Sequence, residues 1–107
     1  MKAINRIKKS EDFGLAINKG NSTRLPSYII HVRKTDTGFT RVGISASNKL
    51  GCAVVRNRVK RQVRAICDEL IDYEKRSLDI VIIIRKQFLE TSFNDNKSLL
   101  SDYMKGL

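Results

Sequence analysis

Apolar residues at helical spacing constrain this chain more than any other feature of its sequence. They follow one another at intervals of four, four, three, four and three residues, over the set Val55, Val59, Val63, Ile66, Leu70 and Tyr73. At ~100° per residue, these side chains fall within an arc of roughly 80°. The segment therefore predicts one amphipathic helix about 28 Å long, whose apolar face is buried in a folded core.

The rest of this helix surface is strongly basic in its first half. Residues 51–64 read GCAVVRNRVKRQVR, with five cationic side chains and no acidic one: Arg56, Arg58, Lys60, Arg61 and Arg64. Because the segment holds no acid that could pair with them at helical spacing, these charges repel one another, which costs stability unless a negative partner offsets it. Arginine predominates, and its planar guanidinium suits bidentate contacts with phosphate.

Charge is unevenly distributed over the 107 residues, whose formal net charge is +10. Residues 1–64 carry 15 Lys+Arg against 3 Asp+Glu, a balance of +12, whereas residues 65–107 carry 6 against 8, a balance of −2. A directed basic surface of this kind indicates a nucleic-acid partner. RNA is favoured over DNA, because strands and a glycine-containing loop precede the basic helix where a helix-turn-helix protein has another helix.

Five further segments complete a predicted α+β fold. A first helix over residues 10–20 begins with Ser10 as a cap, has two acids in its first turn and ends at Gly20. Residues 28–33 and 39–46 flank a turn and predict a β-hairpin. Residues 79–85 (DIVIIIR) predict a central strand buried on both faces, and residues 92–104 predict a last helix. The order α-β-β-α-β-α makes residues 1–107 a single α+β domain.

The sequence lacks the residues of a self-sufficient catalyst. His31 is the only histidine, and no phosphate-binding glycine motif or pair of zinc-ligand spacings is present. Cys52 and Cys67 are expected to be reduced thiols, and the acids within residues 68–79 fit a solvated helix end better than a two-metal site. We therefore interpret the chain as a binding module with no catalytic residue and no metal site.

Membrane attachment is not expected. The longest fully apolar run, residues 80–84, is too short to span a bilayer, and the apolar arc of the basic helix is needed for the core. The first residues, MKAINRIKKSEDF, have no apolar core of a signal peptide. These features favour a cytoplasmic protein.

The strand and basic helix of residues 41–64 resemble a known family. The segment RVGISASNKLGCAVVRNRVKRQVR, residues 41–64, closely resembles the signature of the bacterial ribonuclease P protein subunit. Its centre is Arg56-Asn57-Arg58 (the RNR motif), followed by Lys60-Arg61 and Arg64. The resemblance extends to IKKSEDF near the start and to DIVIIIR after the helix, so it covers most of the chain.

The resemblance implies a function and a mechanism. In this family the catalyst is an RNA, which uses Mg²⁺ to cleave precursor tRNA and leave the mature 5′ end. The protein subunit binds that RNA through the RNR helix, and it holds the single-stranded 5′ leader in a cleft between the first helix, the sheet and the basic helix. It thereby strengthens substrate and Mg²⁺ binding. The resemblance also implies a two-layer α–β sandwich with a left-handed crossover around the RNR helix, against the usual right-handed rule.

The resemblance assigns three groups of residues in this chain. The RNA-binding motif comprises Arg56, Asn57, Arg58, Lys60, Arg61 and Arg64. The leader cleft comprises Phe13, Ile17, His31 and Ser45. Further phosphate contacts are expected from Lys8, Lys9, Arg41, Lys49 and Arg85.

Three positions depart from the family pattern. Ile17 stands where the family commonly has a second aromatic residue, so one stacking platform is lost, which is worth roughly 1–3 kcal/mol per base. His31 stands where an aromatic strand residue is expected; it either stacks and adds a pH-sensitive contact, or is an ordinary strand side chain. Asn48 replaces one of two lysines, whereas Lys49 remains.

Two other functions fit the same basic α+β character. A structural ribosomal protein would bind ribosomal RNA in preference to the catalytic RNA. A protein-only nuclease would cleave RNA by itself with Mg²⁺, but the absence of clustered carboxylates speaks against it.

Overall fold

A four-stranded mixed sheet runs through the centre of the molecule, in the order β1-β2-β4-β3. The structure is a computed structural model that describes all 107 residues. Its strands are β1 (Asn21–Arg24), β2 (Tyr28–Lys34), β3 (Arg41–Ala46) and β4 (Leu78–Ile84). Its helices are α1 (Ser10–Lys19), α2 (Ala53–Leu70) and α3 (Phe93–Lys105), with short 3-10 turns η1 (Ala3–Asn5), η2 (Asn48–Leu50) and η3 (Lys86–Glu90). The predicted α+β fold and element order are confirmed, with β1 as an additional edge strand.

The central position predicted for the apolar strand is confirmed. β4 pairs with β2 in antiparallel register on one side and with β3 in parallel register on the other. Its six buried residues leave only Ile83 partly exposed. Because β3 and β4 are parallel neighbours joined through α2, they form the crossover whose left hand the family resemblance implies.

The β-hairpin predicted from residues 28–33 and 39–46 is wrong. β2 and β3 are consecutive along the chain, yet β4 lies between them and pairs with both. The physical reason is burial, since a strand as apolar as β4 is most stable where both of its faces and both of its edges are covered. The hairpin in this structure is β1–β2, whose fully exposed first strand (NSTR) carries no apolar pattern by which it could have been predicted.

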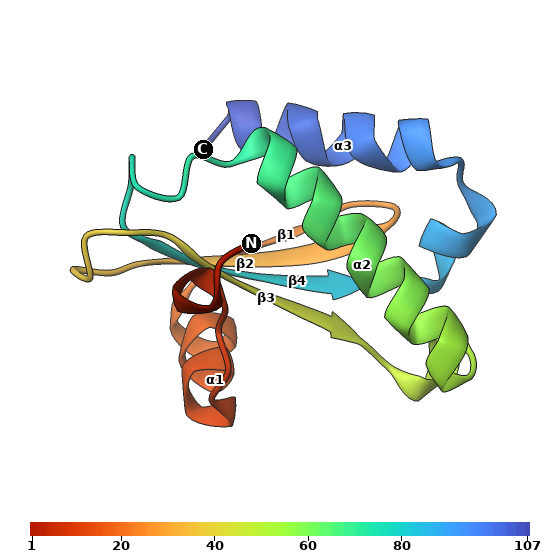
Figure 1. The fold of residues 1–107 in the computed structure, drawn as a ribbon, viewed down its shortest axis with the longest axis horizontal. Helices are drawn as coiled ribbons and strands as arrows, with labels where there is room; N and C mark the ends of the chain where they lie inside the picture. Colours follow the sequence, from red (N-terminus) through yellow and green to blue (C-terminus); the bar gives the residue numbers. More distant parts are fainter.

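Each face of the sheet is covered by different helices (Figure 1). Ile80, Ile82 and Ile84 of β4 point into the main core, which α2 and α3 cover. Val81 and Ile83 point to the opposite face, where they meet Ala16 of α1 in a smaller cluster. Alternating side chains of β4 therefore hold two helical layers on one sheet, and the second layer is a single short helix.

α1 ends where the sequence predicts, and α2 ends earlier than predicted. Gly20 terminates α1, and a Cβ there would lie 2.7 Å from the carbonyl oxygen of Val32, so only glycine fits. Ser10 is the first helical residue and not the cap. The prediction that α2 reaches Tyr73 is wrong: the helix stops at Leu70, and the Asp72 side chain then accepts from the backbone N–H of Glu74, a local bond that competes with helix.

Candidate nucleic-acid interface

The basic and amide side chains of α2 form three parallel rows along the helix. Positions four apart lie on one line of a helix surface, so Arg56, Lys60 and Arg64 form one row. Asn57 and Arg61 form the next row, and Arg58 and Gln62 form the third. The first row is half-buried, whereas Asn57, Arg58 and Arg61 are exposed.

The two outer rows face different parts of the molecule. Arg64 lines a small hollow of about 70 Å³ together with Phe13 of α1 and Ile44 of β3. Arg58 lines a different hollow, of about 170 Å³, with Phe93 at the start of α3. The motif is therefore not one flat patch, because its rows border the α1 side of the molecule and the α3 side separately.

None of the five cations on α2 forms an ion pair. The four ion pairs of the molecule involve the N-terminal amine with Asp68, Arg41 with Asp12 and with Asp79, and Lys97 with Glu69. Of these five cations, only Arg56 makes a side-chain hydrogen bond, donating from Nη1 to Oδ1 of Asn48. The remaining guanidinium and ammonium groups are free to bind phosphate, and their mutual repulsion has no internal compensation.

The residues predicted for the leader cleft share one face of the sheet. The ring of Phe13 lies over Gly43, where a Cβ would be only 2.6 Å from Cζ of the ring. Gly43 and His31 both pair with Val81, from opposite sides of β4, and Ser45 follows Gly43 by two positions along β3. Phe13, His31 and Ser45 are half-buried on this face.

The α1 helix leaves part of this face uncovered. Ala16 is buried against the sheet, but Ile17 beside it is 39 % exposed. Ile29, Ile83 and Ser45 form one row across the strands and are only half-buried. The combination of a half-buried ring, an open apolar strip and Arg64 nearby can accept an extended strand that has both bases and phosphates.

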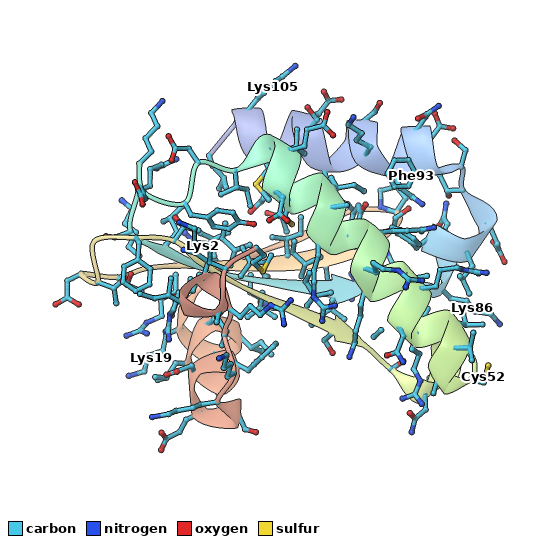
Figure 2. All side chains as sticks on the ribbon, viewed as in Figure 1. Lys2, Lys19, Cys52, Lys86, Phe93 and Lys105 are labelled. Carbon is cyan, nitrogen blue, oxygen red and sulfur yellow. The ribbon has the colours of Figure 1, made fainter.

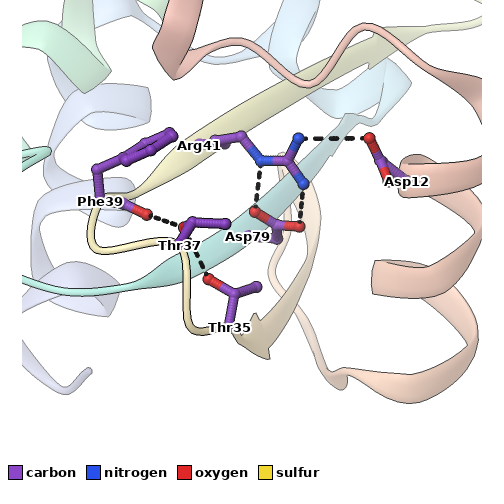
Figure 3. A network of polar contacts seen from close by, with 6 residues as sticks. All are labelled: Asp12, Thr35, Thr37, Phe39, Arg41 and Asp79. Atoms are coloured by element: carbon purple, nitrogen blue, oxygen red, sulfur yellow. Dashed lines mark hydrogen bonds and ion pairs between the residues drawn. The ribbon is translucent and has the colours of Figure 1, made fainter.

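Arg41 has a structural role that the sequence does not reveal. Its Nε donates to Oδ1 of Asp79 at 2.9 Å, its Nη2 donates to Oδ2 of Asp79 at 2.7 Å, and its Nη1 donates to Asp12 at 3.3 Å (Figure 3). The hydrogen bond to Asp79 raises the pKa of Arg41, so the guanidinium stays charged. These bonds tie the first turn of α1 to β3 and β4, which leaves the guanidinium less available to phosphate than the sequence suggests.

The other predicted phosphate contacts are spread over the surface. Lys8 and Lys9 are exposed just before α1, and Lys49 is exposed in η2, close to the start of α2. Arg85 follows β4 and donates from Nη1 to the carbonyl oxygen of Leu25 at 2.9 Å. Arg85 therefore helps to hold the turn between β1 and β2, and only its remaining donors can reach a ligand.

The two cysteines are free and differ in their surroundings. Cys67 is buried in the core, and burial raises the pKa of its thiol to about 12. Cys52 is exposed immediately before α2, and hydrogen bonds from the backbone N–H groups of Val55 and Val54 lower its pKa. The lowered pKa of Cys52 arises from the start of α2 and not from a catalytic base.

Neither a metal cluster nor a membrane span is present in the structure. The histidine, cysteine and acidic side chains form no group of three or more that could hold a metal ion. No helix combines the length and the apolar character needed to traverse a bilayer.

Two residues next to the basic rows were missed by sequence reasoning. Leu89 and Phe93 are large apolar side chains with exposed fractions of 38 % and 43 %, and both line the hollow beside Arg58. Their neighbours in sequence resemble an ordinary connection and helix start. The only available signal was Phe93 directly after a capping serine, a position that does not reach the core.

Comparison with known proteins agrees with these features. The family model described as Ribonuclease P matches residues 1–107. The ribonuclease P protein component of Mesoplasma florum is 40 % identical over 102 residues, which cover 94 % of this chain and 93 % of the relative. The corresponding protein of Bacillus cereus (strain 03BB102) is 37 % identical over 106 residues, which cover 98 % of this chain and 92 % of the relative.

Solved structures show the same fold. The RNase P protein of Staphylococcus aureus superposes with a TM-score of 0.84 at 30 % identity, over 97 % of this chain and 94 % of that one. The RNase P protein from Thermotoga maritima superposes with a TM-score of 0.81 at 29 % identity, over 95 % and 96 % of the two chains.

Proposed function

This chain belongs to the ribonuclease P protein family, and we propose that it assists a catalytic RNA in removing the 5′ leader from precursor tRNA. The observation that carries the proposal is the set of unpaired cations on α2, which lies beside the open sheet face that holds Phe13. One side of α2 can bind folded RNA while the adjoining face accepts a single strand.

The catalytic RNA binds the exposed part of α2. Arg58 and Arg61 project into solvent with no competing carboxylate, and Asn57 supplies an amide between them. Contacts from arginine to phosphate position an RNA without reading its sequence, and each contact releases counterions. The RNA therefore neutralises the charge that destabilises the free protein.

The 5′ leader lies across the sheet face next to α1. Phe13 offers a stacking surface, Ile17 an apolar contact, and Arg64 a charge at the same end of the face. His31 and Ser45 lie farther along that face and offer polar contacts. Since Ile17 cannot stack as an aromatic side chain does, we expect leader affinity to depend mainly on Phe13.

Mg²⁺ acts on the RNA in this proposal. The acidic side chains of this chain are dispersed or paired with cations, as Asp79 is with Arg41. The protein strengthens metal binding indirectly, because its cations reduce the repulsion between substrate and catalytic RNA that Mg²⁺ otherwise has to screen.

The test is a maturation assay with purified components. The protein is mixed with a bacterial ribonuclease P RNA and a leader-bearing precursor tRNA, and 5′ cleavage is followed at low Mg²⁺, with protein alone and RNA alone as controls. We expect cleavage that RNA alone does not sustain. Cleavage by protein alone would identify a protein-only nuclease instead. No gain at any Mg²⁺ concentration, with tighter binding to ribosomal RNA, would identify a ribosomal protein.

Replacing Gly43 by alanine is expected to weaken leader recognition specifically. The new Cβ would lie 2.6 Å and 2.8 Å from two carbons of the Phe13 ring, so the ring has to move off β3. We expect a loss of about 1–3 kcal/mol in the free energy of unfolding, typical of overpacking. We also expect a smaller difference in affinity between precursor tRNA and mature tRNA.

The matched control is Gly14→Ala, since a Cβ at Gly14 on the same helix as Phe13 meets no atom within 4 Å. That variant should keep the preference for precursor tRNA. Leader preference that survives in the Gly43 variant would show that the position of the Phe13 ring is unimportant for the leader.

A further inference from the structure

Two large apolar side chains beside the basic rows of α2, Leu89 and Phe93, do not belong to the core. Phe88 is buried and meets the ring of Tyr28 edge-on, with centroids 5.7 Å apart, but its neighbour Leu89 points outward. Phe93, the first residue of α3, is likewise exposed. Figure 2 shows Phe93 at the first turn of α3.

A hollow of about 170 Å³ separates these two side chains from α2. Leu89 and Phe93 line one side, and Arg58 and Gln62 of the third row of α2 line the other. No acidic side chain lines the hollow. Its walls therefore combine an aromatic ring, an amide that can donate and accept, and a guanidinium, and it has room for a single planar group.

The hollow is built on rigid structure. Asn96 is buried beneath it and donates to the carbonyl oxygens of Phe88 at 3.0 Å and Thr91 at 3.3 Å. The Asn96 side-chain oxygen accepts from the hydroxyl of Ser27 at 2.6 Å, which joins this turn to the sheet. The Ser92 side chain accepts from the N–H of Asp95, which secures the start of α3. Leu89 and Phe93 are thus presented by an ordered turn.

We propose that this hollow between Arg58 and Phe93 is a second RNA-binding site, which takes one unstacked base of the ribonuclease P RNA. The inference rests on the proposed function, because the RNA has to lie on α2 already. The base stacks on Phe93 and contacts Leu89, Gln62 binds its polar edge, and Arg58 binds the adjoining phosphate. Charge favours RNA over a protein segment, since the hollow continues the unpaired cationic surface of α2.

The test measures affinity for ribonuclease P RNA over a range of salt concentrations. We expect Phe93→Ala to weaken binding about tenfold, as for the loss of one stacked base. The slope of log affinity against log salt should stay unchanged, because no phosphate contact is lost. Phe93→Tyr should bind like the parent protein. Phe93→Leu, which keeps an apolar side chain without a flat ring, should also bind more weakly.

The control is Phe39→Ala, a partly exposed aromatic residue in the turn between β2 and β3. That turn lies at the opposite end of the sheet (Figure 1). Phe39→Ala should leave affinity unchanged, and thermal unfolding establishes that each variant is folded. If Phe93→Ala does not fold, the comparison of Phe93→Leu with Phe93→Tyr decides.

Failure of the inference differs from failure of the proposed function. If the parent protein does not bind ribonuclease P RNA, both fall together. If the parent protein binds and Phe93→Ala and Phe93→Leu bind equally well, only the second site is overturned. Unchanged RNA affinity with altered self-association in either variant would show that the hollow contacts protein, which also overturns the proposal.

Discussion

Replacing Lys60, Arg61 and Arg64 together by glutamine is expected to lower affinity for ribonuclease P RNA roughly a hundredfold at 0.1 M salt. The three side chains make no ion pair within the protein, so their positive charges are available to phosphate. Each phosphate contact contributes roughly 0.7–0.9 to the slope of log affinity against log salt. The slope should therefore become shallower by about 2–3 when affinity is measured across a salt series.

Charge position separates this expectation from a general effect of net charge. The control replaces three exposed lysines outside α2, at positions 34, 75 and 105, by glutamine, which removes the same total charge. That control should change the slope by much less. Both variants should fold, and the α2 variant should be at least as stable as the parent, because neighbouring like charges have been removed. Equal effects of the two variants on affinity would contradict a specific surface on α2.

Replacing Asp79 by alanine is expected to lower the free energy of unfolding by about 3–5 kcal/mol, as when one member of a buried ion pair is removed. Asp79 is fully buried in β4 and accepts two hydrogen bonds from Arg41. Without Asp79, the Arg41 guanidinium has only a weak contact to Asp12, although the Arg41 side chain is only 21 % exposed. The total free energy of unfolding of a protein of this size is about 5–15 kcal/mol, so this loss should be severe.

Urea unfolding of a charge-free variant tests how much the ion pair contributes to stability. The variant that combines Arg41→Met with Asp79→Leu removes both charges and keeps apolar volume, so it should be more stable than Asp79→Ala alone. Asp12→Ala, which removes the outer and more exposed partner, should cost less than 1 kcal/mol. A loss below 1 kcal/mol for Asp79→Ala would show that the pair adds little to stability.

Periodicity predicted the elements of this fold well, but strand pairing less well. The helical spacing of Val59, Val63 and Ile66 identified α2, and the apolar run of residues 80–84 identified the central strand. Nearness in sequence favoured a hairpin of β2 with β3, but pairing is decided by which strand most needs to be buried. Periodicity carries no information about that competition. Apolar spacing extends the predicted helix to Tyr73. Tyr73 does pack on the core, but the helix ends at Leu70.

The candidate site was predictable where charge or family resemblance pointed to it. The basic residues of α2 and Phe13 were predicted from the sequence alone. The ion pair of Arg41 with Asp79 could not be predicted, because the two residues are 38 positions apart in sequence. Leu89 lies in the connection before α3 and Phe93 is the first residue of α3. No sequence pattern links them to a ligand; only the position of α2 beside them does.

The strand order also determines when the sheet can be completed during synthesis. β2 and β3 leave the ribosome well before β4, yet neither has its main partner until the chain has been made as far as residue 84. Both strands then expose unpaired edges while α2 still lacks part of its core, and such edges promote aggregation. The rate-limiting event of folding should therefore be insertion of β4 between two strands already present. A chain truncated before residue 78 should remain unfolded, whatever helix it forms locally.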